Sequence, residues 1–395
     1  MLTRDFRSTR PFLCHVTASS RRAGTLFVAT LSLVLATWTG RVAPEGAQAQ
    51  AASAAGHQPV TTELVRLLDA RPDLRRALTA GITRARLAGL STPEDFFAYV
   101  DELATWIPVE RELGPRGLRF YYVIDQAPDD ALNQDLEFDV WLGDFARTMG
   151  SFLDTPASAA GVASFVANPD YHAGDYDRGP SGWLSFNQFF AREVRPGKRP
   201  IAAPCDDNVI VSPADAVFLG QWPIAADSTI TAKGVKWSIT QLLSGSPYAK
   251  AFENGTYTHS FLNINDYHRY HLPVGGVVKE VRNIHGRFSL DVVRNDAGEL
   301  DVHTGDTFQF NQERGLLVVD SPVVGLVAVL PIGMAVISSV NLTPQVGDAL
   351  RKGDEFGYFL FGGSDIVILF QNSRAVLDAR VGAKYLQGER IGSLR

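Results

Sequence analysis

Ser364 stands in a sequence setting that could support chemistry. It follows Gly362 and Gly363 in "FLFGGSDIVILF", residues 359–370, where two apolar, strand-like runs meet. Gly-Gly-Ser-Asp is typical of a tight turn, so the sequence predicts a hairpin in which the serine is a plain turn residue. The alternative is a nucleophile, because glycines leave room for a hydroxyl to approach a backbone carbonyl.

Two histidines and one aspartate could activate such a serine. His268 and His271 lie three residues apart in "NINDYHRYHLPVGG", and Asp215 follows a proline in "SPADA". A histidine can take the proton of a serine hydroxyl, and a carboxylate can orient its ring. Alternatively, the histidines are satisfied by backbone groups and Asp215 caps a turn. A metal site made of the three residues is a weaker alternative, because no further ligand stands at a usual spacing, and no metal is expected.

A charged segment, "GDALRKGDEFGYF" at 347–359, leads into the strand that carries Ser364. Its simplest interpretation is a hairpin with a solvated tip at Lys-Gly-Asp-Glu. A serine-hydrolase elbow is disfavoured, because G-x-S-x-G would need glycine at position 366, which is isoleucine. In that motif a helix follows the serine, whereas here the pattern predicts a strand.

These segments must be positioned by an α+β fold. Residues 58–182 are expected to form a helical N-terminal domain, because apolar residues recur at three- and four-residue intervals and Ser91-Thr92-Pro93 is a good helix start. Residues 183–395 are expected to form a mostly antiparallel β core of short β-branched runs separated by turn residues. The long apolar run at 316–340 contains prolines and glycines, which favours consecutive buried strands over a membrane helix.

The first fifty residues have a different character. Several arginines precede the uncharged run "AGTLFVATLSLVLATWTG", and small residues follow around position 49. This order is typical of a secretory signal, so we expect residues 1–50 to direct export to the periplasm or the exterior, with an uncleaved membrane anchor as the alternative.

The net charge of the whole chain, -6, argues against a nucleic-acid partner.

In chain order, "FNQFFAREVRPGKRP", "SPAD", "DYHRYHLPVGGVV" and "KGDEFGYFLFGGS" resemble the phosphatidylserine decarboxylases and their relatives, which are pyruvoyl enzymes. The resemblance covers roughly residues 183–372, and "DYHRYHLP" and "KGDEFGYFLFGGS" are its most specific parts. Residues 90–180 also resemble the helical N-terminal extension of a soluble-type branch. That branch includes decarboxylases of free amino acids such as tryptophan.

The resemblance implies a lyase that first cleaves itself. Ser364 would attack the carbonyl carbon of Gly363, with His271 as the base and Asp215 as its partner. The resulting ester would eliminate, and hydrolysis would leave a pyruvoyl group derived from Ser364 at the start of a small α chain, residues 364–395. The large β chain would end at Gly363. This covalent pyruvoyl group is the only cofactor implied, and it would bind the substrate amine as a Schiff base and accept the electrons released with CO2.

The resemblance also implies a role for His268, which would return a proton to the decarboxylated carbon. The implied substrate is phosphatidylserine, giving phosphatidylethanolamine. A phospholipid substrate is compatible with an enzyme that acts at a membrane surface. A free amino acid, aromatic ones included, is the alternative substrate, and an uncleaved binding module is the alternative from another class. One departure is Asp365, where phospholipid-acting members usually show threonine.

Overall fold

The computed structural model describes residues 56–394, except 233–234, 304–307 and 337–338. The predicted export signal at 1–50 lies outside the described residues. The helices of the described part are α2 (Pro59–Ala70), α3 (Pro72–Ala85), α4 (Pro93–Ala104), α5 (Glu110–Asp125), α6 (Ala131–Gln134), α7 (Leu136–Leu153), α8 (Val162–Ala167), α9 (Phe186–Phe190) and α10 (Ile239–Leu242).

Side chains cap the starts of α4 and α7. Thr92 caps α4: its side chain accepts from the backbone N–H of Asp95, whose carboxylate accepts from the N–H of Thr92. The helix start expected near Ser91-Thr92-Pro93 is therefore confirmed. Asp135 caps α7 in the same way, by accepting from two backbone N–H groups of its first turn.

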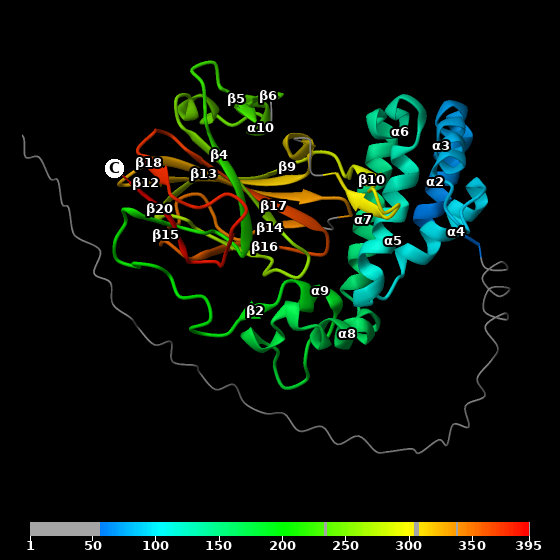
Figure 1. The fold of residues 1–395 in the computed structure, drawn as a ribbon, viewed down its shortest axis with the longest axis horizontal. Coiled ribbons are helices and arrows are strands. Elements are labelled where there is room, and N and C mark those ends of the chain that lie inside the picture. Colours follow the sequence, from blue (N-terminus) through cyan, green and yellow to red (C-terminus); the bar gives the residue numbers. More distant parts are fainter. Residues whose placement is uncertain (1–55, 233–234, 304–307, 337–338, 395) are drawn as a thin grey trace, which may run out of the picture. The chain divides into compact units, whose positions relative to one another are not determined.

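The strands that follow pair only antiparallel among the described residues. Eight of them form one large sheet in the order β15-β9-β12-β13-β17-β7-β4-β19. Figure 1 labels β4, β9, β12, β13, β15 and β17 of this sheet. Their bounds are β4 (Ala216–Pro223), β7 (Thr256–Leu262), β9 (Gly276–Ile284), β12 (Arg314–Ser321), β13 (Gly325–Met334), β15 (Ala349–Leu350), β17 (Gly363–Phe370) and β19 (Lys384–Tyr385).

The remaining strands form small sheets. Two three-stranded sheets have the orders β14-β16-β8 and β18-β20-β3, and three pairs join β1 to β2, β5 to β6 and β10 to β11. Their bounds are β1 (Tyr176–Asp177), β2 (Glu193–Val194), β3 (Val209–Val211), β5 (Thr229–Ala232), β6 (Val235–Ser238), β8 (Arg269–His271), β10 (Val292–Arg294), β11 (Leu300–Val302), β14 (Val340–Leu342), β16 (Glu355–Phe359), β18 (Ala375–Leu377) and β20 (Arg390–Leu394). Helices followed by antiparallel sheets confirm the predicted α+β class.

The apolar run at 316–340 supplies most of β12, all of β13 and the first residue of β14, as the prolines and glycines indicated. β12 and β13 pair with each other at the centre of the large sheet, and their side chains are almost all buried. Within the described ranges, none of the helices has the length and apolar character needed to cross a bilayer.

The helices contact the β part through a hydrophobic core that is shared by both. This core extends from Val60 in α2 to Ile391 in β20, and it covers one face of the large sheet. A second, smaller cluster covers the other face, where Val367 and Leu369 of β17 lie. Because side chains alternate along a strand, Ile366 and Ile368 point to the shared core instead.

The predicted hairpin around Ser364 is wrong. β16 ends at Phe359 in a small sheet, and β17 begins at Gly363 in the large sheet, so 360–362 is a crossover between sheets. Ser364 is therefore the second residue of a strand with partners on both sides. Two apolar runs around Gly-Gly resemble a hairpin locally, but tertiary pairing decides which strands are neighbours.

The predicted solvated tip at 352–355 is also wrong. Lys352 is buried, and its ammonium group donates to the backbone carbonyls of Ala203, Asp206 and Val209. β15 and β16, on either side of this turn, belong to different sheets. The segment is thus a second crossover, and its lysine is held by backbone oxygens.

Candidate active site

Ser364 lies in the middle of the large sheet. In β17 it pairs with Gly333 of β13 and with Leu262 of β7. Its side chain is fully buried, and its hydroxyl oxygen has no hydrogen-bond partner among the described residues. Gly362 has a φ of 153°, a value that L side chains rarely adopt, so glycine is required at the entry to the strand. An unpartnered buried hydroxyl is unusual. In the described part of the chain, Thr61 and Ser321 share this feature, but Ser364 alone of the three directly follows two glycines.

His268 lies in an aromatic cluster next to the segment that leads to Ser364. Its ring stacks on Phe190 of α9, with 4.0 Å between the ring centroids, and Phe190 in turn contacts Phe361. The carbonyl oxygen of His268 accepts from the backbone N–H of Phe359, at the end of β16. The site's first histidine and the crossover before the serine therefore pack against the same side chains.

The imidazole of His268 is held neutral. Neither ring nitrogen has a hydrogen-bond partner in the described part of the chain, and the side chain is fully buried. Burial, and then the positive charge of Arg192, hold the pKa of His268 well below its usual value. At neutral pH this imidazole can accept a proton but has none to give as an imidazolium.

Arg192 itself is buried and lies over aromatic rings. Its guanidinium carbon is 4.3 Å from the ring centre of Tyr176, and one nitrogen donates to the backbone carbonyls of Asn265 and Asp266. It thus connects α9 to the loop just before His268. Its Nε and Nη1 have no hydrogen-bond partner among the described residues.

His271 is fixed at both ring nitrogens. Nδ1 lies 2.9 Å from the carbonyl oxygen of Gly353, and Nε2 lies 3.1 Å from the hydroxyl of Tyr267. Burial is the main reason why the pKa of His271 falls to about 4, so the ring is neutral at pH 7. The charge of Asp215 acts in the opposite direction and raises this pKa, but burial outweighs it.

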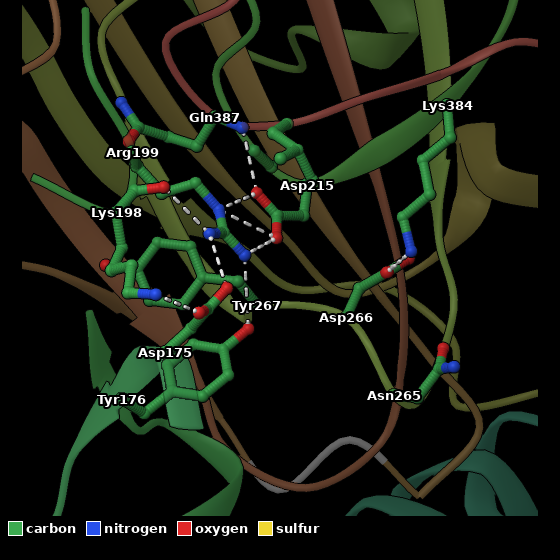
Figure 2. A network of polar contacts seen from close by, with 12 residues as sticks. Asp175, Tyr176, Lys198, Arg199, Asp215, Asn265, Asp266, Tyr267, Lys384 and Gln387 are labelled. Atoms are coloured by element: carbon green, nitrogen blue, oxygen red, sulfur yellow. Dashed lines mark hydrogen bonds and ion pairs between the residues drawn. The ribbon is translucent and has the colours of Figure 1, made fainter. Parts of the chain in front are cut away.

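The carboxylate of Asp215 accepts hydrogen bonds from Arg199 and Gln387, and not from the imidazole of His271. Arg199 Nε lies 2.9 and 3.1 Å from the two carboxylate oxygens, Arg199 Nη2 donates at 2.6 Å, and the backbone N–H of Gln387 donates at 2.8 Å (Figure 2). Arg199 also contacts Asp175, at 3.2 Å. The segment of Asp215 and the strand of His271 are nevertheless in contact, because the backbone N–H of His271 donates to the carbonyl of Pro213.

The predicted site residues therefore have different surroundings. His268 lies on the apolar side around Phe190 and Phe361, whereas His271 and Asp215 lie beside the polar network of Arg199 and Tyr267. Ser364 lies in the large sheet, between Gly333 and Leu262. Direct hydrogen bonds do not join members of the predicted set, as far as the described residues extend. The metal alternative finds no support, since those residues contain no group of ligands that could hold an ion.

Sequence reasoning missed four residues of this region: Arg192, Arg199, Tyr267 and Lys352. Each stands inside a segment whose pattern had been noticed. The partners of Arg192, Arg199 and Lys352 are distant in sequence, whereas Tyr267 contacts His271 only four positions away. Arg199 and Asp215 are sixteen positions apart with no periodicity between them. Only the cluster of basic residues in "RPGKRP" could have directed attention to Arg199.

A cavity of about 590 Å³ opens next to the crossover that precedes Ser364. Tyr358 and Leu360 line it from the crossover side, and Arg269, Trp183 and Asn187 line it from the facing segments. The side-chain oxygen of Asn187 accepts from the backbone N–H of Phe361 at 3.3 Å. Much of the lining is charged or polar, so this is a place where a small polar molecule could approach the site.

Comparison with known proteins places these residues inside one matched region. A sequence model described as phosphatidylserine decarboxylase matches residues 186–393, slightly more than half of the chain. All four predicted site residues lie within that range. The match also includes α9 and every strand of the large sheet, so it covers the strands on both sides of Ser364.

Relatives with similar sequences carry a corresponding name. Phosphatidylserine decarboxylase proenzyme 3 of Schizosaccharomyces pombe is 31% identical over 251 residues, which are 62% of this chain and 25% of that protein. The proenzyme of Fusobacterium nucleatum is 28% identical over 305 residues, 75% of this chain and 97% of the relative. That of Clostridium novyi is 27% identical over 257 residues, 63% and 84%. The chain thus spans a quarter of the yeast protein and most of the bacterial ones.

Proposed function

The chain belongs to the phosphatidylserine decarboxylase family, a family of enzymes that are carboxy-lyases, and on this premise we propose that it matures by cleaving itself between Gly363 and Ser364. The observation that carries the proposal is the buried, unpartnered hydroxyl of Ser364 on a central strand. A hydroxyl without a partner is not held away from the neighbouring carbonyl carbon by a competing hydrogen bond. Relatives named proenzymes support a processed product.

The cleavage step needs a base for the serine proton, and we assign this role to His271. The ring is neutral and its Nε2 carries the lone pair, so this role requires the hydroxyl of Tyr267, 3.1 Å away, to move aside and the hydroxyl of Ser364 to reach Nε2. The oxygen of Ser364 attacks the carbonyl carbon of Gly363, and the proton moves through His271 to the departing amide nitrogen. Asp215 acts through space, because its negative charge favours the imidazolium that forms.

The residues around Ser364 fit a pyruvoyl group at this position. Leu262 and Gly333 flank it in the sheet, and the face it points to is otherwise apolar. Such a group supplies a ketone that takes up a substrate amine and withdraws electrons as CO2 leaves. The apolar surroundings exclude water from this chemistry.

We assign proton transfer to the substrate to His268. A primary amine arrives as an ammonium ion and must lose protons before it can react as a nucleophile. The neutral ring of His268 is able to take such a proton, and it then has one to return to the carbon that has lost CO2. The low pKa of the buried ring favours this return. In this order His268 first accepts and then donates.

The proposed reaction is the decarboxylation of phosphatidylserine to phosphatidylethanolamine, by analogy with the named activity of the relatives. A second candidate is the decarboxylation of a free amino acid. The cavity beside the crossover favours it, since its lining includes charged and polar side chains that suit a small zwitterion better than acyl chains. Release of CO2 from phosphatidylserine vesicles and from a panel of free amino acids separates the two.

Self-cleavage is tested by denaturing gel electrophoresis and intact-mass measurement of the purified chain. We expect two fragments that meet at residue 364, the smaller one blocked against Edman sequencing. Ser364→Ala should stay whole. Ser321→Ala is the matched control, because Ser321 is also buried with an unpartnered hydroxyl but lies in β12, and this variant should cleave normally. A wild-type chain that folds and never cleaves would leave the binding-module alternative, and labelling by a fluorophosphonate would favour a serine hydrolase.

We further propose that the chain is exported, on the basis of the basic and apolar segments at residues 1–50. Membrane-associated or extracytoplasmic protein is then the expected mature form. N-terminal sequencing of protein recovered from the periplasm and the medium tests this point separately from the enzyme's activity.

A further inference from the structure

The hydrogen bonds at His271 determine which ring nitrogen carries the proton. The carbonyl oxygen of Gly353, 2.9 Å from Nδ1, can only accept, so Nδ1 must carry the hydrogen. Nε2 then has the lone pair, and the hydroxyl of Tyr267 donates to it. In serine–histidine pairs a carboxylate usually accepts from Nδ1. Here a backbone carbonyl takes that place, because Arg199 and Gln387 bind the oxygens of Asp215.

The turn that carries this carbonyl is tied to the strand of His271. The N–H of Gly353 donates to the carbonyl of Leu272 at 2.8 Å, and the N–H of Leu272 donates to the carbonyl of Asp354 at 2.9 Å. Gly353 has a φ of 83°, and a Cβ at this position would lie 2.5 Å from the end of Ile201. The turn therefore needs glycine here, and its carbonyl points at the imidazole as a result of a specific backbone shape.

Lys352 fastens the same turn from the other side. Its Nζ donates to the carbonyls of Ala203 at 2.7 Å, Asp206 at 2.6 Å and Val209 at 3.2 Å. An ammonium group has three donors, and three backbone oxygens satisfy all of them, which explains how the lysine can be buried at 6% exposure. The contacts join the turn to the segment just before β3, which leads to Asp215.

We propose that Lys352 is a positioning residue for self-cleavage, which holds the Gly353 carbonyl against Nδ1 of His271 and thereby keeps Nε2 free to accept a proton. The assignment of His271 as the base rests on the proposed function. Without the ammonium group, three carbonyls lose their shared partner and the turn is released from the 203–209 segment. The imidazole can then adopt the other tautomer, whose Nε2 carries a hydrogen and cannot act as a base.

The test combines Lys352→Met, which keeps the length of the side chain and removes its donors, with Lys279→Met as the matched control. Lys279 lies on β9, partly exposed, with its ammonium 3.8 Å from Asp320. We expect Lys352→Met to cleave roughly 10- to 100-fold more slowly than wild type, the range expected when a catalytic group loses its orientation. Lys279→Met should cleave at the wild-type rate.

The tautomer is measured separately, by ¹⁵N NMR of histidine in uncleavable Ser364→Ala protein. We expect the hydrogen on Nδ1 of His271 in this protein, and a shift toward the Nε2–H form when Lys352→Met is added. An unchanged tautomer or an unchanged cleavage rate in folded Lys352→Met would overturn the proposal. If that variant does not fold, a hydrogen on Nε2 in Ser364→Ala alone overturns it. Absence of cleavage in the wild type would count against the proposed function. The tautomer measurement would still test whether Lys352 positions the ring of His271.

Discussion

Asp365 and His259 form a buried pair on the face of the large sheet opposite to the side chain of Ser364. The carboxylate oxygen Oδ2 lies 3.1 Å from Nε2 of the imidazole, and both side chains are almost fully buried. His259 stands on β7 and Asp365 on β17, so the proposed cleavage would leave the two residues on different chains. The pair would then be a polar contact between the products, one residue away from the new end.

We therefore expect Asp365→Asn to destabilise the protein. Neither His259 Nε2 nor Asp365 Oδ2 has a hydrogen bond of good geometry among the described residues, so the 3.1 Å contact acts through charge, and its loss in this buried setting should cost at most about 1–3 kcal/mol. Chemical denaturation of Asp365→Asn, His259→Gln and the double variant gives the coupling between the two side chains. Effects that simply add would show that the 3.1 Å contact contributes nothing to stability.

Asp215→Asn should lower both stability and the rate of self-cleavage. It removes the closer of the two counter-charges of the buried Arg199 guanidinium and leaves Asp175 at 3.2 Å, so the cost should stay below the about 3–5 kcal/mol of a fully unpaired buried charge. The double variant Asp215→Asn/Arg199→Gln should recover much of the stability, because no unpaired charge remains. It should not recover cleavage, since the charge that favours protonated His271 is still missing. Wild-type cleavage by the double variant, followed on gels, would make Asp215 purely structural.

The pH dependence of cleavage follows from the pKa of His271, which burial lowers to about 4. The base is neutral at any higher pH, so we expect a rate that is flat between roughly pH 6 and 8 and falls on acidification toward pH 4. The pKa of this histidine is about 6.5 in the unfolded chain and about 4 in the folded one. Between these two values the unfolded chain binds more protons, so stability also falls as the pH drops from about 6.5 to 4. Rates are measured on purified precursor and corrected for the folded fraction. A midpoint near pH 6.5 would contradict the buried setting.

His268→Ala should separate maturation from turnover. We expect it to cleave, because His271 is the proposed base for that step, but to release CO2 at least about 100-fold more slowly than wild type, in line with the loss of a general acid–base group. The comparison uses gel-verified cleaved protein and a CO2 assay with the better of the two substrate classes. If His268→Ala fails to cleave, His268 and not His271 would be assigned as the base for self-cleavage.

Asp125, at the end of α5, gives a prediction for the contact between the helices and the β part. Its carboxylate accepts from the backbone N–H of Val292 and from the side chain of Asn133, and burial raises its pKa to about 7. The folded state thus holds a proton that the unfolded chain loses above about pH 4, so this group lowers stability as the pH rises through that window.

Asp125→Asn should therefore raise the melting temperature clearly more at pH 8 than at pH 5, with an upper bound at pH 8 of about 4 kcal/mol from a shift of three pKa units. Asp129→Asn, at an exposed position nearby, serves as the control and should change neither value. An equal change at both pH values would mean that the ionisation of Asp125 is not responsible.

The sequence allowed correct prediction of features that depend on neighbouring residues. The helix start at Thr92 follows from its own capping chemistry, and the pairing of β12 with β13 follows from an apolar run with turn residues in its middle. The crossover before Ser364 could not be predicted, because its apolar flanks look like hairpin strands whatever sheets they join. The burial of Lys352 has no local signal either, since its three acceptors are backbone oxygens almost 150 positions away.

The part of the chain after Gly363 is threaded through two sheets. β17 lies between β13 and β7, β19 lies at the edge of the same sheet, and β18 and β20 complete another sheet with β3. A peptide with this path cannot be added to, or withdrawn from, a finished molecule. Folding would therefore have to precede the proposed cleavage, and the two products would remain together as one non-covalent complex. After denaturation, such a cleaved protein would lack the covalent continuity that guided its assembly.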